Sequence, residues 1–436
     1  MKDTKLKNTF YIPHGLFNNI FKYLGYNDAD KLQDINYEFQ QLVKQYKWND
    51  TKNPFNYSLE IWKNKFPNAI GIKVSIYYQL TDNECIYLKG VKYLDMSFQS
   101  KITDKAFENL KGIHTLNIEY CSNITDKAFK NLKGIHTLII SGCKQKTITD
   151  KAFKNLKGIH TLDMADCDQQ TITDKAFENL KGIRILDISW CKQKTITDKA
   201  FENLKGINYI NMSHCNQQTI TDKAFENLKG INYINMSNCN QETITDKAFE
   251  NLKGTIHTLN MSNCNQETIT DKAFKNLKGI HMLKMSNCNQ ETITDKAFKN
   301  LKGIHTLIMS KCNQQTITDK AFENFKGIHT LNMSWCKQRT ITDKAFVNLK
   351  GIHTLDMSLC NQLTITDKAF EYLKGIRVLN MSRCKQQTIT DKIFENLKGI
   401  HTLNMFDCKQ ITITDKVFEN LKGIHTLNMD TVSKLQ

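Results

Sequence analysis

A cysteine that returns every 24 residues is the feature that most constrains how this chain folds. The spacing is constant apart from one step of 25, which the extra Thr255 causes. The regular cysteines are Cys143, Cys167, Cys191, Cys215, Cys239, Cys264, Cys288, Cys312, Cys336, Cys360, Cys384 and Cys408. Such a period predicts a stack of equivalent units, in which the core lengthens with each unit and no separate domains are added.

Shorter and less regular units precede these copies. Two units of 22 residues are marked by Thr103-Asp104 and Thr125-Asp126, and a degenerate unit opens at Leu80-Thr81-Asp82. The chain contains fifteen Thr-Asp pairs and fifteen Lys-Gly pairs of this kind. The array is therefore expected to comprise about fifteen coils, over residues 72–429.

Within one unit, residues 158–180, the apolar spacing predicts a strand followed by a helix. Leu162 and Met164 alternate as inward-facing strand residues do. Thr173-Asp174 is typical of a helix start, because threonine caps free amides and aspartate favours the positive end of the helix dipole. Ala176, Phe177 and Leu180 then form one apolar helical face.

A glycine closes each of these helices. Gly182 follows the helical pattern at the position where a left-handed backbone is needed, and fifteen of the nineteen glycines occupy this slot. One strand and one helix cannot bury their apolar faces alone, so neighbouring units must stack. We expect parallel strands on a concave side and helices on a convex side.

These motifs resemble the cysteine-containing subtype of leucine-rich repeat. Ile159, Leu162 and Met164 follow its L-x-x-L-x-L spacing, and Cys167 stands where other repeats have asparagine. The resemblance implies an α/β leucine-rich-repeat solenoid with a horseshoe shape.

Residues 1–50 lack the repeat and show two helical patterns. Leu16, Ile20, Phe21 and Leu24 form one apolar face, and a second face follows Gly25-Tyr26-Asn27 at Leu32, Ile35, Phe39 and Leu42. One interpretation is a small helical cap that covers the first coil. Residues 51–71 are then a linker or N-terminal cap, and residues 430–436 a short tail.

The order of these residues, from Pro13 to Trp48, also resembles an all-α F-box domain. Gly15, Ala29 and Tyr37 depart from the family pattern, which commonly has an acidic residue, leucine and arginine there. F-box proteins with such repeats resemble substrate receptors of cullin-RING (SCF-type) ubiquitin ligases, whose F-box docks on a Skp-type adaptor. The resemblance implies adaptor contacts by Pro13, Leu16, Ile20, Phe21, Ile35 and Phe39, some of which must pack internally.

One column of the repeat varies much more than the others, the residue directly before the cysteine. By strand alternation we expect it at the exposed end of the concave strand. Exposed tryptophan and arginine are favoured interface anchors. The candidate partner-binding residues are Trp190, His214, Lys311, Trp335 and Arg383. The alternative is neutral variation at a tolerant surface position.

The repeated histidines and cysteines invite a metal or catalytic interpretation, which the spacing disfavours. Ten of the twelve histidines occupy one column, but His160 and Cys167 of one coil lie roughly 20 Å apart along extended chain. Close-packed imidazoles should instead resist protonation. Buried thiols at the turn are favoured over disulfides. A catalytic group is needed once, whereas these residues recur in most coils. We expect no enzyme activity, cofactor or metal.

Charge and hydropathy limit the remaining functions. The chain carries 60 Lys and Arg against 44 Asp and Glu, a formal +16. Because the lysines alternate with acidic residues along the helical side, nucleic-acid binding is a less favoured alternative. No apolar run is long enough to span a membrane. Without a visible secretory signal, a reducing cytoplasmic or nuclear location is expected. The leading hypothesis is that the chain is the substrate receptor of a ubiquitin ligase and binds an unknown protein substrate on its concave face. The alternative is a plain binding scaffold that recruits no ligase.

Overall fold

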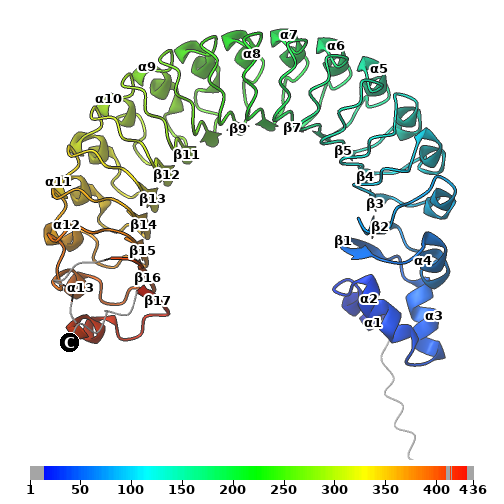
Figure 1. Cartoon of the computed structure of the whole chain (residues 1–436), viewed down its shortest axis with the longest axis horizontal. Coiled ribbons are helices and arrows are strands. Elements are labelled where there is room, and N and C mark those ends of the chain that lie inside the picture. The colour runs from blue at the N-terminus through cyan, green and yellow to red at the C-terminus, as the bar shows by residue number, and fades with distance from the viewer. Residues whose placement is uncertain (1–13, 409–412, 414, 430–436) are drawn as a thin grey trace, which may run out of the picture. The chain divides into compact units, whose positions relative to one another are not determined.

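The computed structural model describes residues 14–408, 413 and 415–429. The chain divides into two compact units, Met1–Thr171 and Ile172–Gln436. In each unit a short strand alternates with a short helical turn, and the strands lie on one side of the coils and the helical turns on the other (Figure 1).

The first unit begins with three helices and continues into the coils. Its helices and 3₁₀ turns are α1 (His14–Phe21), α2 (Tyr26–Gln33), α3 (Tyr37–Gln45), α4 (Leu59–Lys65), η1 (Glu84–Leu88), η2 (Asp104–Asn109), η3 (Ala128–Leu132) and α5 (Asp150–Phe153). Its strands are β1 (Asn49–Phe55), β2 (Gly71–Val74), β3 (Tyr93–Asp95), β4 (Thr115–Asn117), β5 (Thr137–Ile139) and β6 (Thr161–Asp163).

The second unit consists of coils throughout. Its strands are β7 (Ile185–Asp187), β8 (Tyr209–Asn211), β9 (Tyr233–Asn235), β10 (Thr258–Asn260), β11 (Met282–Lys284), β12 (Thr306–Ile308), β13 (Thr330–Asn332), β14 (Thr354–Asp356), β15 (Val378–Asn380), β16 (Thr402–Met405) and β17 (Thr426–Met429). Its helical turns are α6 (Asp174–Phe177), α7 (Asp198–Phe201), α8 (Asp222–Glu226), η4 (Asp246–Leu252), α9 (Asp271–Phe274), η5 (Lys275–Leu277), α10 (Asp295–Phe298), η6 (Asp319–Asn324), α11 (Asp343–Phe346), η7 (Val347–Leu349), α12 (Asp367–Glu371), α13 (Ile393–Asn396) and η8 (Asp415–Leu421).

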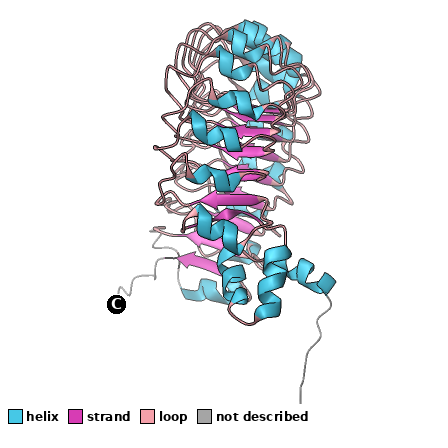
Figure 2. Cartoon of the chain, turned by 90° about the vertical axis from the view of Figure 1, so that its right-hand side faces the viewer, coloured by secondary structure: helices cyan, strands magenta, loops and turns pink. Residues whose placement is uncertain are grey.

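From β2 onward the strands of each unit pair in parallel and in register, whereas the parallel pairing of β1 with β2 shifts register between Asp50 and Pro54. Leu94 of β3 pairs with Leu116 of β4 in the first unit, and Ile210 of β8 pairs with Ile234 of β9 in the second. The side view of the N-terminal part shows these strands lying one above another (Figure 2). Because the register does not shift between coils, each residue type of the repeat forms a column that runs along its unit.

The local structure of a coil follows the predicted pattern, with a shorter helix. Leu162 and Met164 are buried, and Thr173 caps α6 by accepting a hydrogen bond from the amide of Lys175. Gly182 has φ +91°, the left-handed conformation that glycine adopts without steric cost. The helix ends at Phe177, so Leu180 lies beyond it and is still buried.

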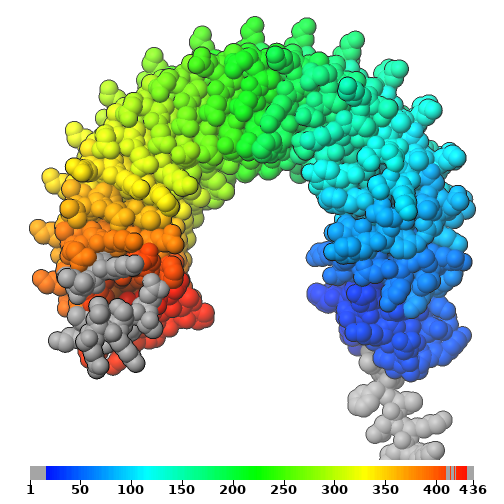
Figure 3. Space-filling view, in the orientation of Figure 1, coloured from blue at the N-terminus to red at the C-terminus, as the bar shows by residue number. Residues whose placement is uncertain are grey.

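The core of the repeats is formed by the same columns in every coil. Ala176, Phe177, Leu180 and Ile183 are each fully buried, as are their counterparts in most other coils. Burying one such large side chain contributes roughly 1.5–3 kcal/mol. The surface of the helical side differs sharply, since side chains project from it at regular intervals in both units (Figure 3).

The three N-terminal helices are attached to the first strand–helix pair by aromatic side chains. Tyr26 of α2 lies 6.3 Å from the ring of Trp48, 5.7 Å from Phe55 and 4.7 Å from Phe66. Burial raises the pKa of Tyr26, whose hydroxyl donates a hydrogen bond to the carbonyl of Gly71.

Residues 51–71, expected to be a linker or an N-terminal cap, are ordered as a strand and a helix. Most of β1 and all of α4 lie there, and β1 pairs in parallel with β2. The expected boundary at residue 50 therefore falls inside a strand, because the solenoid-like pairing begins before the sequence repeat does.

Neighbouring coils are also joined by a recurring aspartate–threonine pair. The carboxylate of Asp295 accepts hydrogen bonds from the amide of Thr318 at 2.7 Å and from its hydroxyl at 2.7 Å. Thr318 in turn caps its own helical turn. The aspartate thus has a further role that the dipole argument did not reveal, since it holds the helix start of the following coil.

We predict that Asp295→Ala lowers the free energy of unfolding by about 2 kcal/mol, because it leaves two partly buried donors of Thr318 without an acceptor. Urea unfolding and hydrogen exchange at the Thr318 amide measure the effect. The control is Lys296→Ala, which removes the neighbouring exposed side chain. Equal exchange protection of Thr318 in both variants would contradict the role of Asp295.

Candidate binding surface

From the coil of Phe98 to that of Asp407, the residue of the variable column has a positive φ in a turn. We call the residues of this column the ridge. They directly precede Cys121 and the regularly spaced cysteines from Cys143 to Cys408, which we call the ladder cysteines. In the coil before Cys121, the ridge residue precedes Gln99. The ridge of the first unit is Phe98, Tyr120, Gly142 and Asp166. The ridge of the second unit is Trp190, His214, Asn238, Asn263, Asn287, Lys311, Trp335, Leu359, Arg383 and Asp407. The φ angles of the non-glycine members lie between 54° and 62°.

Backbone hydrogen bonds explain why the chain turns here. The amide of Cys336 donates to the carbonyl of Met333 at 3.1 Å, which closes a tight turn with the ridge residue Trp335 in its third position. The amide of Trp335 donates to Ser358 of the next coil at 2.8 Å. The turn is therefore fixed both by its own coil and by its neighbour.

This geometry corrects the expected position of the column. Trp335 is three residues beyond Asn332, where β13 ends, and does not lie on the strand. Alternation along the strand could not locate it, because alternation stops where the backbone bends. In each unit the ridge residues follow the carboxyl ends of the strands.

The left-handed conformation is costly for half of the residues found there. Asparagine, aspartate, histidine and glycine enter it with little strain, but a bulky side chain does so rarely. The cost is on the order of 1–2 kcal/mol per residue. Trp190 and Trp335 therefore occupy a position that asparagine, present in three other coils of this unit, would fill at lower cost.

Trp190 is stacked on the next ridge residue and lies under a cation. Its ring lies 3.7 Å from that of His214 with 13° between the planes, and the Nζ of Lys192 is 4.6 Å from its centroid. Its side chain remains 43% exposed. Burial, followed by the charge of Lys192, lowers the pKa of His214. Both predicted residues, Trp190 and His214, thus belong to one cluster.

Trp335 lies close to two cations, one from the preceding coil and one from its own coil. The Nζ atoms of Lys311 and Lys337 are 5.5 Å and 5.0 Å from its ring centroid. Trp335 is 39% exposed, and both lysines are exposed. A cation over the face of an exposed tryptophan contributes about 0.5–1 kcal/mol. The predicted residues Lys311 and Trp335 are therefore in direct contact.

Arg383, the fifth predicted partner residue, is placed differently. Its Nε lies 3.8 Å from the carboxylate of Asp407, and the Nζ of Lys385 lies 3.5 Å from the same oxygen. The Arg383 side chain is 51% exposed and shares the single carboxylate of Asp407 with Lys385. Arg383 therefore differs from the lysines around the two tryptophans in having an acidic partner within the ridge.

The ridge of the first unit contains an aromatic pair that the sequence analysis did not select. Phe98 and Tyr120 stack with 5.0 Å between their centroids, and each is 45% exposed. The Tyr120 ring lies over Gly142, where an added Cβ would be 2.3 Å from it. The sequence could have indicated this pair, because two successive members of the column are aromatic and the next member is glycine.

The ladder cysteines point inward beneath the ridge. The thiol of Cys215 donates to the carbonyl of Ile188 at 3.1 Å, and most ladder cysteines make the equivalent bond. The cysteines of the described chain are free and almost all buried. Burial raises the pKa of the Cys121, Cys239 and Cys312 thiols to about 12. The predicted packing of buried thiols at the turn is confirmed.

Polar ladders hold the loop that follows each cysteine. The amide of Asn265 donates to the Oδ1 of Asn240 at 2.7 Å, and Asn289 donates to Asn265 at the same distance. The next column is glutamine and is buried; the Gln217 amide donates to the carbonyl of Cys191 at 3.1 Å. These hydrogen bonds join each loop to the preceding coil and so hold the segment that directly follows the ridge residue and its cysteine.

The histidine column forms stacks on the strand side. The His281 ring lies 4.6 Å from that of His257 and 4.4 Å from that of His305. Burial, followed by the charges of His305 and His257, lowers the pKa of His281. The predicted resistance to protonation is confirmed for this residue. Within the described ranges, no group of three or more potential metal ligands occurs.

The N-terminal residues predicted to contact an adaptor divide into exposed and buried positions. Leu16, Ile20 and Ile35 are 51%, 47% and 59% exposed. Phe21 is buried against Trp48, at 5.1 Å between ring centroids. Phe21 therefore supports the surface and does not form it.

The remaining two adaptor residues complete this picture. Phe39 of α3 is half-buried and packs edge-on against Phe17 of α1 at 5.4 Å. It can contact a partner only with the part of its ring that remains accessible. Pro13 lies outside the described residues.

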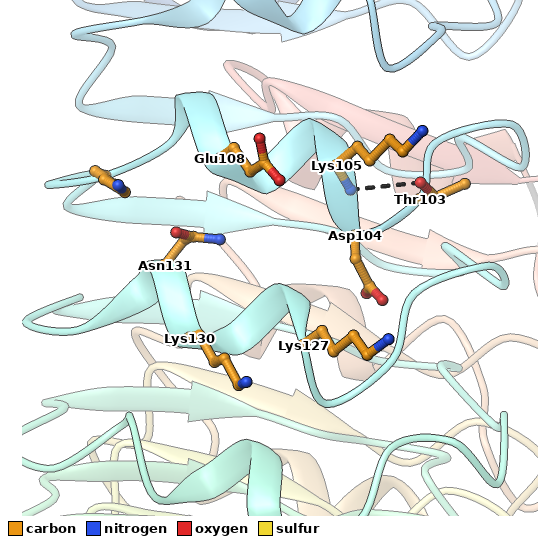
Figure 4. A pocket seen from close by; sticks show the side chains of 8 residues that line it. Thr103, Asp104, Lys105, Glu108, Lys127, Lys130 and Asn131 are labelled. Atoms are coloured by element: carbon orange, nitrogen blue, oxygen red, sulfur yellow. Dashed lines mark hydrogen bonds between the residues drawn. The ribbon is translucent and has the colours of Figure 1, made fainter.

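The helical side carries open polar pockets between neighbouring turns. One in the first unit has a volume of about 630 Å³ and is lined by Thr103, Asp104, Lys105, Glu108, Lys127 and Lys130, among others (Figure 4). The Asp104 side chain points from η2 toward the next coil, where it accepts hydrogen bonds from Thr125. The residues that line this pocket belong to columns of the repeat that recur in the other coils, so the pocket is part of the scaffold.

Comparison with known proteins identifies the repeat. A family model for the BspA-type leucine-rich repeat region matches six times in all, over residues 82–208, 194–329 and 291–425. The chain belongs to the BspA-type leucine-rich-repeat family. No curated protein matches the sequence. No helix in the described part of the chain is both long and apolar enough to cross a membrane.

Solved structures share the fold at low sequence identity. Toll in the Toll–Spatzle complex of Drosophila has a TM-score of 0.58 and 16% identity, over 78% of this chain and 46% of that chain. TLR13 in its complex with ssRNA13 has a TM-score of 0.59 and 16% identity, over 84% and 58%. The chain thus spans about half the length of these two proteins. A leucine-rich-repeat protein of Leptospira interrogans, at a TM-score of 0.55 and 15% identity, matches 81% of this chain and 99% of its own.

We predict that the stability of this leucine-rich-repeat protein falls as the pH rises above 9. The unfolded thiols titrate near their ordinary pKa of 9, whereas folded Cys239 and Cys312 keep their protons to about 12. Below pH 9 both states are protonated, so the stabilisation is complete there and is lost through this window. Urea unfolding between pH 8 and 11, under reducing conditions, measures the slope.

Other groups titrate in the same pH range, so a matched variant isolates the thiols. Replacing Cys239 and Cys312 together by alanine should make the fall between pH 9 and 11 less steep. An unchanged slope would show that the thiols do not drive the alkaline loss.

Proposed function

We propose that this chain is a binding scaffold without enzyme activity, which holds a protein partner against the ridge and the strand side of its coils. The observation that carries the proposal is the pair of exposed tryptophans in left-handed turns, Trp190 and Trp335. Strained residues persist where the surrounding structure holds them and where they serve a function. Tryptophan is also the residue type most enriched at interface hot spots.

The family assignment and the neighbouring structures support a binding role. The Toll structure is that of a complex with Spatzle. The scaffold columns are nearly identical from coil to coil, so a single catalytic arrangement is not distinguished among them. The buried, free thiols also support the proposal of a reducing location, in the cytoplasm or nucleus.

We predict that replacing Trp190 and Trp335 together by asparagine removes the captured partner. Asparagine already occupies this turn in three coils, so the fold should be retained. A tryptophan hot spot contributes about 2 kcal/mol or more, and each 1.4 kcal/mol is tenfold in affinity. Affinity capture from source-cell extract with quantitative mass spectrometry should therefore show at least a tenfold loss.

The matched control is Lys320→Asn, an exposed substitution on the helical side of the second unit. It should leave the captured partner unchanged. The proposal is wrong if the double tryptophan variant retains every protein that the unmodified chain captures, or if Lys320→Asn loses the partner equally.

A second function, recruitment of a Skp-type adaptor and a cullin complex, is favoured by the exposure of the N-terminal apolar residues. A helical cap needs only its inner face to be apolar, yet Leu16, Ile20 and Ile35 are about half exposed. Exposed apolar residues of this size mark interaction sites when they cluster. In this version of the proposal the scaffold is the substrate receptor of a ubiquitin ligase.

We predict that Ile20→Asp abolishes co-purification with a Skp-type adaptor without unfolding the chain. A charge at an exposed docking position must be desolvated on binding, which costs more than the contact contributes. Phe21 is unsuitable for this test, because it is buried and its replacement would disturb the fold.

The control is Ile61→Asp, which alters an isoleucine of comparable exposure, 43%, on α4 outside the three helices. Absence of adaptor from the unmodified chain, with the partner on the ridge still captured, would leave the plain scaffold and exclude ligase recruitment. Equal losses in Ile20→Asp and Ile61→Asp would also exclude docking by the three helices.

A further inference from the structure

The ridge and the loop beneath it carry charge in an ordered pattern along the second unit. The segment from Trp190 reads W-C-K-Q-K-T, and that from Trp335 reads W-C-K-Q-R-T. No other described coil of this unit combines a tryptophan with two cations in this way. Between the two segments, the corresponding loop position is acidic in three consecutive coils, at Glu242, Glu267 and Glu291.

These two cationic clusters have the same construction. In the first, Lys192 lies over Trp190 and Lys194 is exposed two residues further on. In the second, Lys337 lies over Trp335 and Arg339 is exposed at the equivalent position. Lys311 adds a further cation from the coil before. Each cluster thus presents an aromatic ring surrounded by positive charge.

The cations of these clusters have no acidic group within ion-pair distance in the described part of the chain. Among the described residues, none of Lys192, Lys194, Lys311, Lys337 and Arg339 takes part in an ion pair. Other basic residues beside the ridge behave differently. Lys144 pairs with Asp166 at 2.6 Å in the first unit, and Arg383 and Lys385 share Asp407 in the second.

The acidic middle is equally exposed and equally free of ion pairs. Glu242, Glu267 and Glu291 are all exposed, and none forms an ion pair within the described chain. Their loops are held by the asparagine ladder, and Asn263 and Asn287 of the ridge are joined by a side-chain hydrogen bond at 2.8 Å. The loops that follow the ridge between the clusters are therefore acidic and are held by hydrogen bonds between coils.

The distance between the clusters follows from the strand pairing. Strands β7 to β13 pair in register without a shift, so six coil steps separate Trp190 from Trp335. With neighbouring strands about 4.8 Å apart, the clusters are about 29 Å apart along the sheet. A single partner of ordinary size can span this distance.

We propose that the second unit binds a protein partner that presents two acidic patches about 29 Å apart, separated by a segment that is not acidic. This inference rests on the proposed function of the ridge as a binding surface and names the chemistry of the partner. Complementary charge fixes the position of such a partner along the ridge, and the tryptophans contribute the apolar contacts that anchor it.

A polyanion with continuous charge fits this surface less well. The phosphates of a nucleic acid would have to pass Glu242, Glu267 and Glu291 in the three central coils between the clusters. A base needs an accessible aromatic face for stacking. The ring of Trp190 is already stacked on His214, and that of Trp335 is in contact with two lysines.

Synthetic peptides of fixed length test the proposal directly. Two blocks of three glutamates joined by six prolines place the block centres about 29 Å apart, since a proline segment extends about 3.1 Å per residue and an extended block about 3.3 Å. A peptide with the same blocks and one proline is the control of equal charge. Fluorescence anisotropy of the labelled peptides at a salt concentration near that of cells measures binding to the full chain.

The six-proline peptide should bind at least tenfold more tightly than the one-proline peptide, because both blocks bind at once. Replacing Lys192 and Lys194 together by asparagine should remove this difference, since only the cluster around Trp335 then keeps its cations. Leu359→Asn, a ridge substitution outside the clusters, should preserve it.

Equal affinity of the two peptides for the unmodified chain would overturn the spacing, and no binding of either would overturn the acidic partner. Tighter binding of oligothymidine than of the six-proline peptide would replace the protein partner by a nucleic acid. Each of these results leaves the capture experiment with the double tryptophan variant valid, so failure here is distinct from failure of the scaffold function.

Discussion

In-register hydrogen bonding between the strands of neighbouring coils determines where every repeated side chain of this protein lies. A single strand and helical turn cannot bury their apolar faces, so each coil is stable only against the next. Once the register is set, as between Leu307 and Leu331, every equivalent residue must meet its own counterpart one strand spacing away. The thiol, histidine, asparagine and aspartate–threonine ladders are consequences of this pairing.

Repetition makes these ladders good scaffold and poor determinants of specificity. A column such as that of Asp295 and Thr318 repeats the same contact in coil after coil, so it cannot distinguish one position along the array from another. Only columns whose residues change can do so, and the ridge is the most variable of them. Its left-handed turn projects each residue from the edge of the coil, which allows Trp190 and Trp335 to be exposed while the cysteines behind them stay buried.

Several elements could be derived from the sequence because they depend on local spacing. The buried Leu162, the threonine cap of Thr173 and the left-handed Gly182 follow from a period of two, from helix-end chemistry and from the freedom of glycine. The adaptor residues could be derived only in part. Helical spacing places Ile20 and Phe21 in one apolar segment, but it does not reveal that Phe21 packs on Trp48 while Ile20 remains exposed.

The sequence by itself thus determined the repeated coil, its fold family and the identity of the variable column. Only the tertiary structure decided that this column lies in a left-handed turn, and which of its charges are already paired. Arg383 and Trp335 look equivalent as members of one column, yet Arg383 forms an ion pair with Asp407 whereas Trp335 lies close to Lys311 and Lys337. The physical reason is that the contacts with Asp407 and Lys311 form between coils, across about 24 residues of chain, and therefore depend on the stacking rather than on local sequence.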